Sequence, residues 1–202
     1  TIIPFEPLWE QYKRIIKPKG AIMLTAAQPF TSALVMSNPK MFKYGMVWIK
    51  PNGTSPFKAK YMPMTRHEDV LVFSSGRTTY NPQMETGKAY KWNSQRSGGE
   101  ASSITQSRQT PIDNSGTRYP TGLLHFKQER GLHPTQKPVA LFEYLIKTYT
   151  NEGDLVLDNV AGSGTTGVAC QNLNRNFILM EQKPEYVEII KKRLAKGKEA
   201  ML

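Results

Sequence analysis

Cysteine and histidine are scarce in this chain, which limits the kinds of site that it can build. Its 202 residues contain one cysteine, Cys170, and three histidines, so neither an internal disulfide nor a cysteine-cluster metal site can form. No apolar run reaches the roughly 20 residues that span a membrane, and no signal-peptide pattern opens the sequence. We therefore expect a protein of the reducing cytoplasm, with Cys170 in the core and with neither a metal nor a membrane as partner.

Acidic residues are also few relative to basic ones. The chain has 16 Asp and Glu against 27 Lys and Arg, which gives a formal net charge of +11 and a pI near 9.7. Such an excess favours a polyanionic partner, and a nucleic acid fits better than a membrane surface. A basic protein without such a partner is the alternative that charge alone leaves open. The length suits one sizeable α/β domain with a well-buried core.

Small residues are concentrated in residues 153–167, GDLVLDNVAGSGTTG, around which the rest of the chain is organised. The apolar run 155–157 predicts a buried parallel strand, and residues 165–173 predict a helix after a tight turn. Glycines let the backbone approach a ligand closely, and the start of the helix leaves several N–H groups without partners. Strand, glycine turn and helix together are typical of a nucleotide-type cofactor site.

The charge beside the turn indicates which nucleotide is bound. Gly162, Gly164 and Gly167 match the dinucleotide pattern G-x-G-x-x-G, and Glu181 lies about twenty residues further on, but that match alone is weak. Asp158 ends the strand just before the turn, where a carboxylate repels a pyrophosphate and attracts an ammonium or sulfonium group. Only one further strand and helix follow in the sequence, too few for a second mononucleotide-binding half. S-adenosylmethionine therefore fits better than a nicotinamide dinucleotide.

Two motifs carry a resemblance to a known family. Residues 158–166, DNVAGSGTT, resemble the D-P-F-x-G-S-G-T-T cofactor motif of the DNA amino-methyltransferases, which modify adenine N6 or cytosine N4. Residues 133–138, HPTQKP, resemble the companion motif H-P-T-x-K-P of that family, and the two motifs together are far more specific than either alone. Asn159 and Val160 depart from the usual Pro-Phe.

The resemblance implies an α/β fold, with a Rossmann-like S-adenosylmethionine-dependent methyltransferase sheet that is mostly parallel, has one antiparallel strand and carries helices on both faces. It also implies a permuted order, with a catalytic half in residues 1–75, an irregular target-recognition insert in 76–130 and the cofactor-binding half in 131–202. Apolar periodicity agrees with helices at 8–16, 29–36, 138–150, 165–173 and 184–194 and with strands at 21–26, 45–50, 69–74, 154–158 and 176–180. A loop is expected between residues 50 and 69, and a frayed tail from 196 to 202.

The site residues that the resemblance implies lie mainly in the two motifs. Glu181 is expected to accept hydrogen bonds from the ribose hydroxyls, and Asp158 from the amino group of the cofactor. Thr135 and Lys137 match positions that hold the methionine carboxylate, whereas Gly167 is expected to serve helix packing. The residues expected to contact the cofactor are Thr135, Lys137, Asp158, Ala161, Gly162, Ser163, Gly164, Thr165 and Glu181.

Three further residues have two interpretations each. His133 either fixes a turn through a hydrogen bond or contacts the cofactor. His67 and Glu68 precede a strand at a position near the target-base pocket of the family. They either touch the base or serve an ordinary strand-edge role.

The insert at 76–130 loses apolar periodicity and becomes rich in basic and amide side chains. Lys and Arg number eight there against four acids, a net charge of +4, and aromatic residues are interleaved with them. This composition suits phosphate contacts and base-edge readout of double-stranded DNA, while a flexible solvated loop is the alternative. The residues expected to bind DNA are Arg77, Arg96, Arg108 and Arg118.

The catalytic tetrapeptide of the family, D/N/S-P-P-Y/F/W, is missing, because the sequence contains no Pro-Pro pair. In the family its polar side chain and a proline carbonyl hold the target amine, while its aromatic ring stacks on the flipped base. It stands there shortly before a segment like residues 1–9. We therefore expect it upstream of Thr1, on a strand between 154–158 and 21–26, and the catalytic residues stay unassigned.

The expected function is transfer of a methyl group from S-adenosylmethionine to the exocyclic amine of a flipped DNA base, adenine N6 before cytosine N4. The expected setting is a bacterial or phage-encoded restriction-modification system near the nucleoid. Three alternatives stay open. They are a non-catalytic DNA-binding remnant of the family, an RNA methyltransferase, which the long basic insert disfavours, and a nicotinamide oxidoreductase, which Asp158 disfavours.

Overall fold

The structure, a computed structural model, describes residues 2–54, 56–92 and 112–199. The chain forms two compact units, the first from Thr1–Asn81 and Thr121–Leu202 and the second from Pro82–Pro120. The second unit falls within the insert expected at 76–130. Arg96 and Arg108 lie outside the described residues.

The first unit contains a four-stranded sheet in the order β1 (Ile22–Ala26), β3 (Thr65–Phe73), β2 (Phe42–Thr54) and β8 (Leu123–His125). β3 runs antiparallel to both β1 and β2, and β2 runs parallel to β8, so β3 is the antiparallel strand of this sheet. Alternation along β3 directs Val70 and Val72 to one face and Leu71 and Phe73 to the other, and all four are buried.

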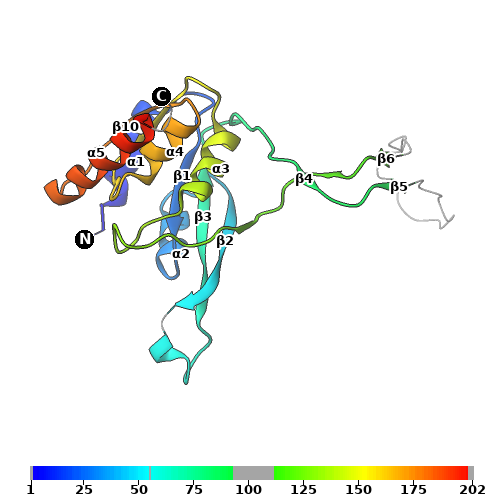
Figure 1. Cartoon of the computed structure of the whole chain (residues 1–202), viewed down its shortest axis with the longest axis horizontal. Helices are drawn as coiled ribbons and strands as arrows, with labels where there is room; N and C mark the ends of the chain where they lie inside the picture. Colours follow the sequence, from blue (N-terminus) through cyan, green and yellow to red (C-terminus); the bar gives the residue numbers. More distant parts are fainter. Residues whose placement is uncertain (1, 55, 93–111, 200–202) are drawn as a thin grey trace. The chain divides into compact units, whose positions relative to one another are not determined.

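Helices cover both faces of this sheet, as the resemblance implied (Figure 1). On one face, α1 (Phe5–Ile15) and α2 (Phe30–Ser37) bring Trp9 and Leu34 into the apolar cluster around Phe73. On the other face, α3 (Val139–Tyr149) packs Leu141 into the cluster that contains the fully buried Trp48. Two apolar clusters on opposite faces thus fix the sheet between its helices.

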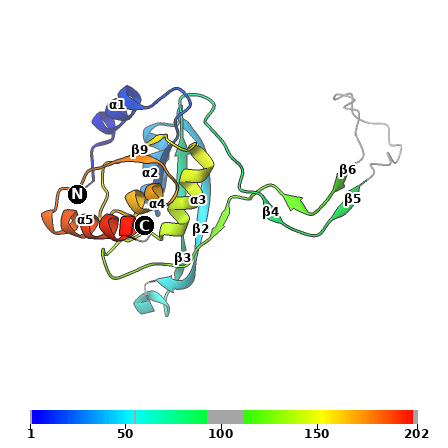
Figure 2. The same ribbon diagram turned by 45° about the horizontal axis from the view of Figure 1, so that its top comes forward.

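The glycine-rich stretch lies in a second, two-stranded sheet. β9 (Leu155–Asp158) and β10 (Asn176–Leu179) pair in parallel, with Asp158 opposite Leu179. α4 (Thr165–Asn172) connects them and packs between α3 and α5 (Pro184–Glu199) (Figure 2). Cys170 of α4 is fully buried, which confirms its predicted place in the core, and burial raises the pKa of its thiol to about 12.

One face of the two-stranded sheet is covered and the other is open among the described residues. Val156 and Phe177 pack against α3 and α4, whereas Leu155, Leu157 and Ile178 are 52%, 36% and 46% exposed. Within the described part of the chain, β9 pairs only with β10 and β1 only with β3. The strand expected between β1 and β9 is not among the described strands.

Several element bounds differ from the expected ones, among them β2, which begins at Phe42, and β3, which begins at Thr65. Part of the expected loop after residue 50 continues β2, because Thr54 pairs with Thr65 across the hairpin, and η1 (Pro56–Lys58) follows it. α5 continues to Glu199 where a frayed tail was expected, since the lysines and alanine after Leu194 are good helix formers. α1 begins earlier than expected, at Phe5.

The described residues of the second unit include two short antiparallel strand pairs. β4 (Glu85–Thr86) pairs with β7 (Thr117–Arg118), and β5 (Tyr90–Trp92) pairs with β6 (Ile112–Asn114). The insert therefore contains paired β-strands where only irregular backbone was expected. None of the helices in the described part of either unit is long and apolar enough to cross a membrane.

Candidate cofactor site

The turn after β9 adopts a backbone that requires glycine at two positions. Gly162 and Gly164 have φ angles of 53° and 78°, a left-handed conformation that residues with side chains rarely adopt. The Ala161 N–H donates to the Met180 carbonyl at 2.9 Å, which ties the turn to the end of β10. A Cβ on Gly167 would lie 2.7 Å from the side chain of Leu179 in β10, as expected for a glycine that lets the helix pack against the sheet.

Asp158 lies at the carboxyl end of β9 with both carboxylate oxygens engaged. Its Oδ1 accepts a hydrogen bond from the Val160 N–H at 3.1 Å, and its Oδ2 accepts one from the Thr166 hydroxyl on α4. These bonds fix the direction of the carboxylate. Each oxygen has a further lone pair, so the group can also accept a bond from a ligand.

The two residues that depart from the family motif have different surroundings. Asn159 Oδ1 accepts a hydrogen bond from the Tyr12 hydroxyl of α1 at 3.0 Å. Val160 is 63% exposed beside the turn. The turn is therefore held here by a contact with α1, where the family has the rigid ring of a proline.

Glu181 follows β10 and points its carboxylate at the same turn. Its Oε2 accepts a hydrogen bond from the Gly162 N–H at 2.8 Å, and its Oε1 accepts one from the Lys183 N–H at 3.0 Å. Slight burial opposes ionisation, but these backbone N–H groups outweigh it and hold the pKa of Glu181 below its ordinary value of 4.5. Glu181 is therefore an anionic acceptor at neutral pH.

The motif at 133–138 meets the glycine turn. The Thr165 hydroxyl donates to the Lys137 carbonyl at 3.1 Å, and a Cβ on Gly162 would lie 3.5 Å from the His133 ring. His133 Nδ1 accepts a hydrogen bond from the Thr135 N–H at 3.2 Å and lies 3.1 Å from the Thr135 hydroxyl. His133 thus fixes its own turn and also lines the glycine turn, so the structure brings the two motifs together.

Arg193 on α5 binds residues of the glycine turn through its guanidinium group, a role that sequence reasoning missed. Its Nη1 donates to the Ser163 carbonyl at 2.8 Å and lies 3.3 Å from the hydroxyls of Ser163 and Thr165. Burial lowers the pKa of its guanidinium. Ile190, one helical turn earlier, packs where a Cβ on Gly164 would approach it to 2.8 Å. The i, i+3 spacing puts Ile190 and Arg193 on one face of α5, but nothing in the sequence indicates that this face meets the turn.

Three residues that were expected to contact the cofactor are buried. Ala161, Ser163 and Thr165 are 7%, 3% and 5% exposed, and the hydroxyls of Ser163 and Thr165 are near Arg193. Their side chains are therefore enclosed by the protein around the turn, and their contact with the cofactor stays a prediction.

Glu68 on β3 joins two lysines in a mostly buried ion-pair network. Its Oε2 accepts a hydrogen bond from Lys137 Nζ at 2.6 Å, and its Oε1 accepts one from Lys50 Nζ. The two ammonium groups lie 5.9 Å and 5.0 Å from the centre of the Trp48 ring. Burial opposes ionisation of Glu68, but the two lysines outweigh it and hold the pKa of Glu68 below 4.5. Glu68 therefore anchors Lys137, while His67 pairs with Ile49 across the strands.

Replacing Glu68 with glutamine is expected to lower the free energy of unfolding by about 2 kcal/mol at pH 7, because two ammonium groups lose their anion. In the wild type this contribution is fully present above the ordinary pKa of glutamate. It is lost as the pH falls through the lowered folded pKa, since protonation of Glu68 breaks both ion pairs. Urea denaturation over a pH series measures both effects. Glu143→Gln, which alters an exposed carboxylate bonded to Asn172, is the control, and an equal loss there would contradict the assignment.

Of the four arginines expected to bind DNA, the two that the structure describes lie in different units. Arg77 lines a polar cavity of about 370 Å³ together with Asn151, which precedes β9, and so lies away from Asp158 at the other end of that strand. Arg118 stacks on the Tyr90 ring, with 4.6 Å between the guanidinium carbon and the ring centre. Arg77 is therefore not among the residues at the glycine turn.

The residues around the turn form a site with separated charges. Asp158 and Glu181 supply acceptors at the turn, and Lys137, whose carbonyl contacts the turn, has its ammonium group paired with Glu68 on β3. Val160 and Met180, which are 63% and 52% exposed, offer apolar surface beside the two carboxylates. In the part of the chain that the structure describes, no group of His, Cys, Asp and Glu could hold a metal ion. The arrangement suits a ligand with hydroxyl and amino groups, an apolar ring and a carboxylate.

Comparisons with known proteins assign the chain to a family. A family model described as DNA methylase matches residues 4–192. The type II methyltransferase M.HpaI of Haemophilus parainfluenzae is 30% identical over 203 residues, which cover 95% of this chain and 59% of M.HpaI. The type II methyltransferase M2.LlaDCHI of Lactococcus lactis subsp. cremoris is 49% identical over 79 residues, which cover 38% of this chain and 29% of that protein. The chain thus spans less than two thirds of these relatives.

Solved structures agree with the fold. The crystal structure of the M1.HpyAVI–SAM complex has a TM-score of 0.65 and 27% identity, and the match covers 94% of this chain and 81% of that chain. The PvuII DNA methyltransferase, described as cytosine-N4-specific, has a TM-score of 0.68 and 19% identity over 96% of this chain and 74% of that chain. These neighbours confirm the predicted Rossmann-like methyltransferase fold.

Proposed function

Because this chain belongs to the DNA methylase family of N6/N4 amino-methyltransferases, we propose that it holds the cofactor-binding and DNA-binding parts of a DNA amino-methyltransferase. The target is the exocyclic amine of a base in double-stranded DNA, with adenine N6 the first candidate and cytosine N4 the second. The observation that carries the proposal is that residues 133–138 contact the glycine turn within residues 158–166, to which Glu181 also bonds. The bacterial relatives support a restriction-modification role in the bacterial cytoplasm.

The cofactor in this proposal is S-adenosylmethionine, which the residues at the turn fit. Glu181 is suited to accept bonds from the ribose hydroxyls, Asp158 from the amino group, and Lys137 to face the carboxylate. Val160 and Met180 offer apolar surface to the adenine ring. A nicotinamide dinucleotide fits less well, because its pyrophosphate would meet the two carboxylates.

Methyl transfer depends more on positioning of the target amine than on acid–base catalysis. The cofactor supplies a methyl group that its sulfonium already activates, so the protein must chiefly hold the amine in line with it. In this chain, Asp158 and Glu181 would fix the cofactor, and Glu68 would hold the Lys137 ammonium group in place. Arg193 would keep the turn itself in place.

DNA binding is expected to be mainly electrostatic, which the net charge of +4 in the insert supports. If about four to six phosphates are contacted, the logarithm of the affinity falls against the logarithm of salt concentration with a slope of roughly −4 to −5. Replacing Arg96, Arg108 and Arg118 together with alanine is expected to flatten that slope. Fluorescence anisotropy with a mixed-sequence duplex over a salt series measures it, with Arg14→Ala on α1 as the control. Binding that does not depend on salt would contradict the role of the insert.

A second candidate, a non-catalytic DNA-binding member of the same family, is favoured by one observation. The sequence has no Pro-Pro pair and hence no catalytic tetrapeptide. The two candidates agree on cofactor and DNA binding and differ in methyl transfer.

A further inference from the structure

The β2–β3 hairpin ends in a stretch that is exposed throughout. Every described residue from 56 to 67 is exposed, and Figure 1 shows η1 at the end of the cyan hairpin, beyond the helices. Phe57 and Tyr61 are 93% and 85% exposed, and Met62 and Met64 are 53% and 44% exposed. Large apolar side chains gathered on one projecting segment are typical of an interaction surface.

The charge of the hairpin indicates what kind of partner this surface fits. Residues 56–67 include Lys58, Lys60 and Arg66 and no acidic residue. In the part of the chain that the structure describes, neither Lys58 nor Lys60 forms an ion pair. Two cations between exposed aromatic rings therefore suit an anionic partner that also offers flat apolar surfaces, such as nucleic acid bases.

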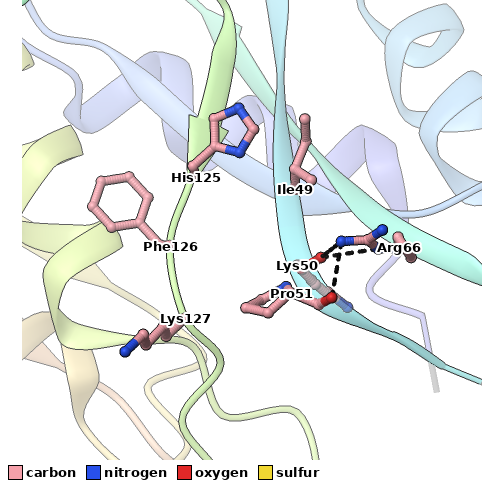
Figure 3. Close-up of a pocket in the computed structure, with 7 residues that line it drawn as sticks. All are labelled: Ile49, Lys50, Pro51, Arg66, His125, Phe126 and Lys127. Carbon is pink, nitrogen blue, oxygen red and sulfur yellow. Dashed lines mark hydrogen bonds between the residues drawn. The ribbon is translucent and has the colours of Figure 1, made fainter.

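A basic cavity of about 250 Å³ lies at the root of the hairpin (Figure 3). Arg66 lines one side, where it donates to the Pro51 carbonyl at 2.8 Å, and His125 and Lys127 line the other. The cavity opens where the pairing of β2 with β8 ends at Ile49 and His125. Positive side chains thus continue from the tip of the hairpin to its root.

The root of the hairpin is joined to the glycine turn by a short chain of contacts. Glu68, in the β3 strand of the hairpin, accepts a hydrogen bond from Lys137 Nζ at 2.6 Å. The Lys137 carbonyl in turn accepts one from the Thr165 hydroxyl at 3.1 Å. A substrate that is presented at the turn therefore lies beside the strand that continues into the exposed stretch.

We propose that the tip of the β2–β3 hairpin binds the DNA duplex beside the target base, an inference that rests on the proposed function. Lys58 and Lys60 contact phosphates, and the rings of Phe57 and Tyr61 stack on bases where the duplex is opened. An anionic membrane surface would also attract lysines and aromatic rings. DNA is favoured because the hairpin root contacts the cofactor site, across which the substrate must lie.

Two double variants of the full chain separate the two kinds of contact. Phe57→Ala/Tyr61→Ala is expected to weaken binding of a duplex with a central mismatch by about tenfold or more, because stacking on the bases is lost. It should leave the salt dependence unchanged. Lys58→Ala/Lys60→Ala is expected to reduce the slope of log affinity against log salt by about 2, because two phosphates lose their partners.

Lys40→Ala/Lys43→Ala is the matched control, because these exposed lysines lie at the beginning of β2, at the opposite end of the strand from the hairpin tip. Circular dichroism melts verify that each variant folds. If the wild type binds duplex and both hairpin variants bind it equally well, the hairpin inference is overturned while the proposed function stands. If the wild type binds no duplex, both are overturned. Binding to phosphatidylserine vesicles in place of duplex, lost in the hairpin variants, would assign the surface to membranes.

Discussion

Replacing Asp158 with alanine is expected to weaken S-adenosylmethionine binding by roughly 10- to 100-fold. A hydrogen bond to a charged group is worth about 1.5–3 kcal/mol, and each 1.4 kcal/mol changes the affinity tenfold. The substitution also removes the acceptor for the Val160 N–H and the Thr166 hydroxyl, which hold the turn. Isothermal titration of the cofactor or its demethylated product into the variant measures the loss.

Two other variants serve as controls for the Asp158→Ala measurement. Asp154→Ala removes a carboxylate from the other end of the same strand, where it accepts a bond from the Asn151 N–H at 2.8 Å. It should leave cofactor affinity unchanged. Asp158→Asn keeps an acceptor without the charge and should fall between the wild type and alanine. If Asp158→Ala and Asp154→Ala bind S-adenosylmethionine with equal affinity, Asp158 does not contact the cofactor.

The 202 residues by themselves are expected to transfer no methyl groups to DNA, even where they bind the cofactor. The sequence has no D/N/S-P-P-Y/F/W tetrapeptide, so the groups that hold the amine and stack on the flipped base are not among its residues. Within the described part of the chain, β9 also has no strand on the side away from β10. Incubation with labelled S-adenosylmethionine and a mixed-sequence duplex tests the expectation, with M.HpaI as the active control.

Label in the DNA would contradict this expectation. It would mean that another part of the chain holds the target amine. His67 and Glu68 would then be the first residues to substitute, because they lie on β3, where Glu68 binds Lys137, whose carbonyl contacts Thr165 of the glycine turn. Hydrolysis of the labelled DNA to nucleosides would show whether adenine or cytosine carries the methyl group.

The core of the cofactor site could be predicted because its signals are local. Gly162 and Gly164 are separated by one residue in the sequence and adopt the left-handed backbone that the turn needs. Asp158 ends its strand four positions before Gly162, and Glu181 follows the next strand. A strand, a turn and a helix that are contiguous in sequence specify one another without reference to the rest of the fold.

Contacts between distant segments could not be predicted in this way. Glu68 and Lys137 are 69 positions apart, and Arg193 and Ser163 are 30 apart, so only the folded chain shows that each pair meets. The outer part of the β2–β3 hairpin, between residues 50 and 69, was expected to be a loop for a related reason. Its prolines and glycine predict irregular backbone, but pairing across the hairpin overrides that local preference.

A calorimetric comparison of S-adenosylmethionine with NADH on the wild-type chain tests the central claim most directly, because the two ligands differ at the charges that Asp158 and Glu181 would meet. We predict saturable binding of S-adenosylmethionine and its demethylated product, weakened in Asp158→Ala, with no heat of binding from NADH. Tight binding of NADH together with no response to either S-adenosyl ligand would contradict the account.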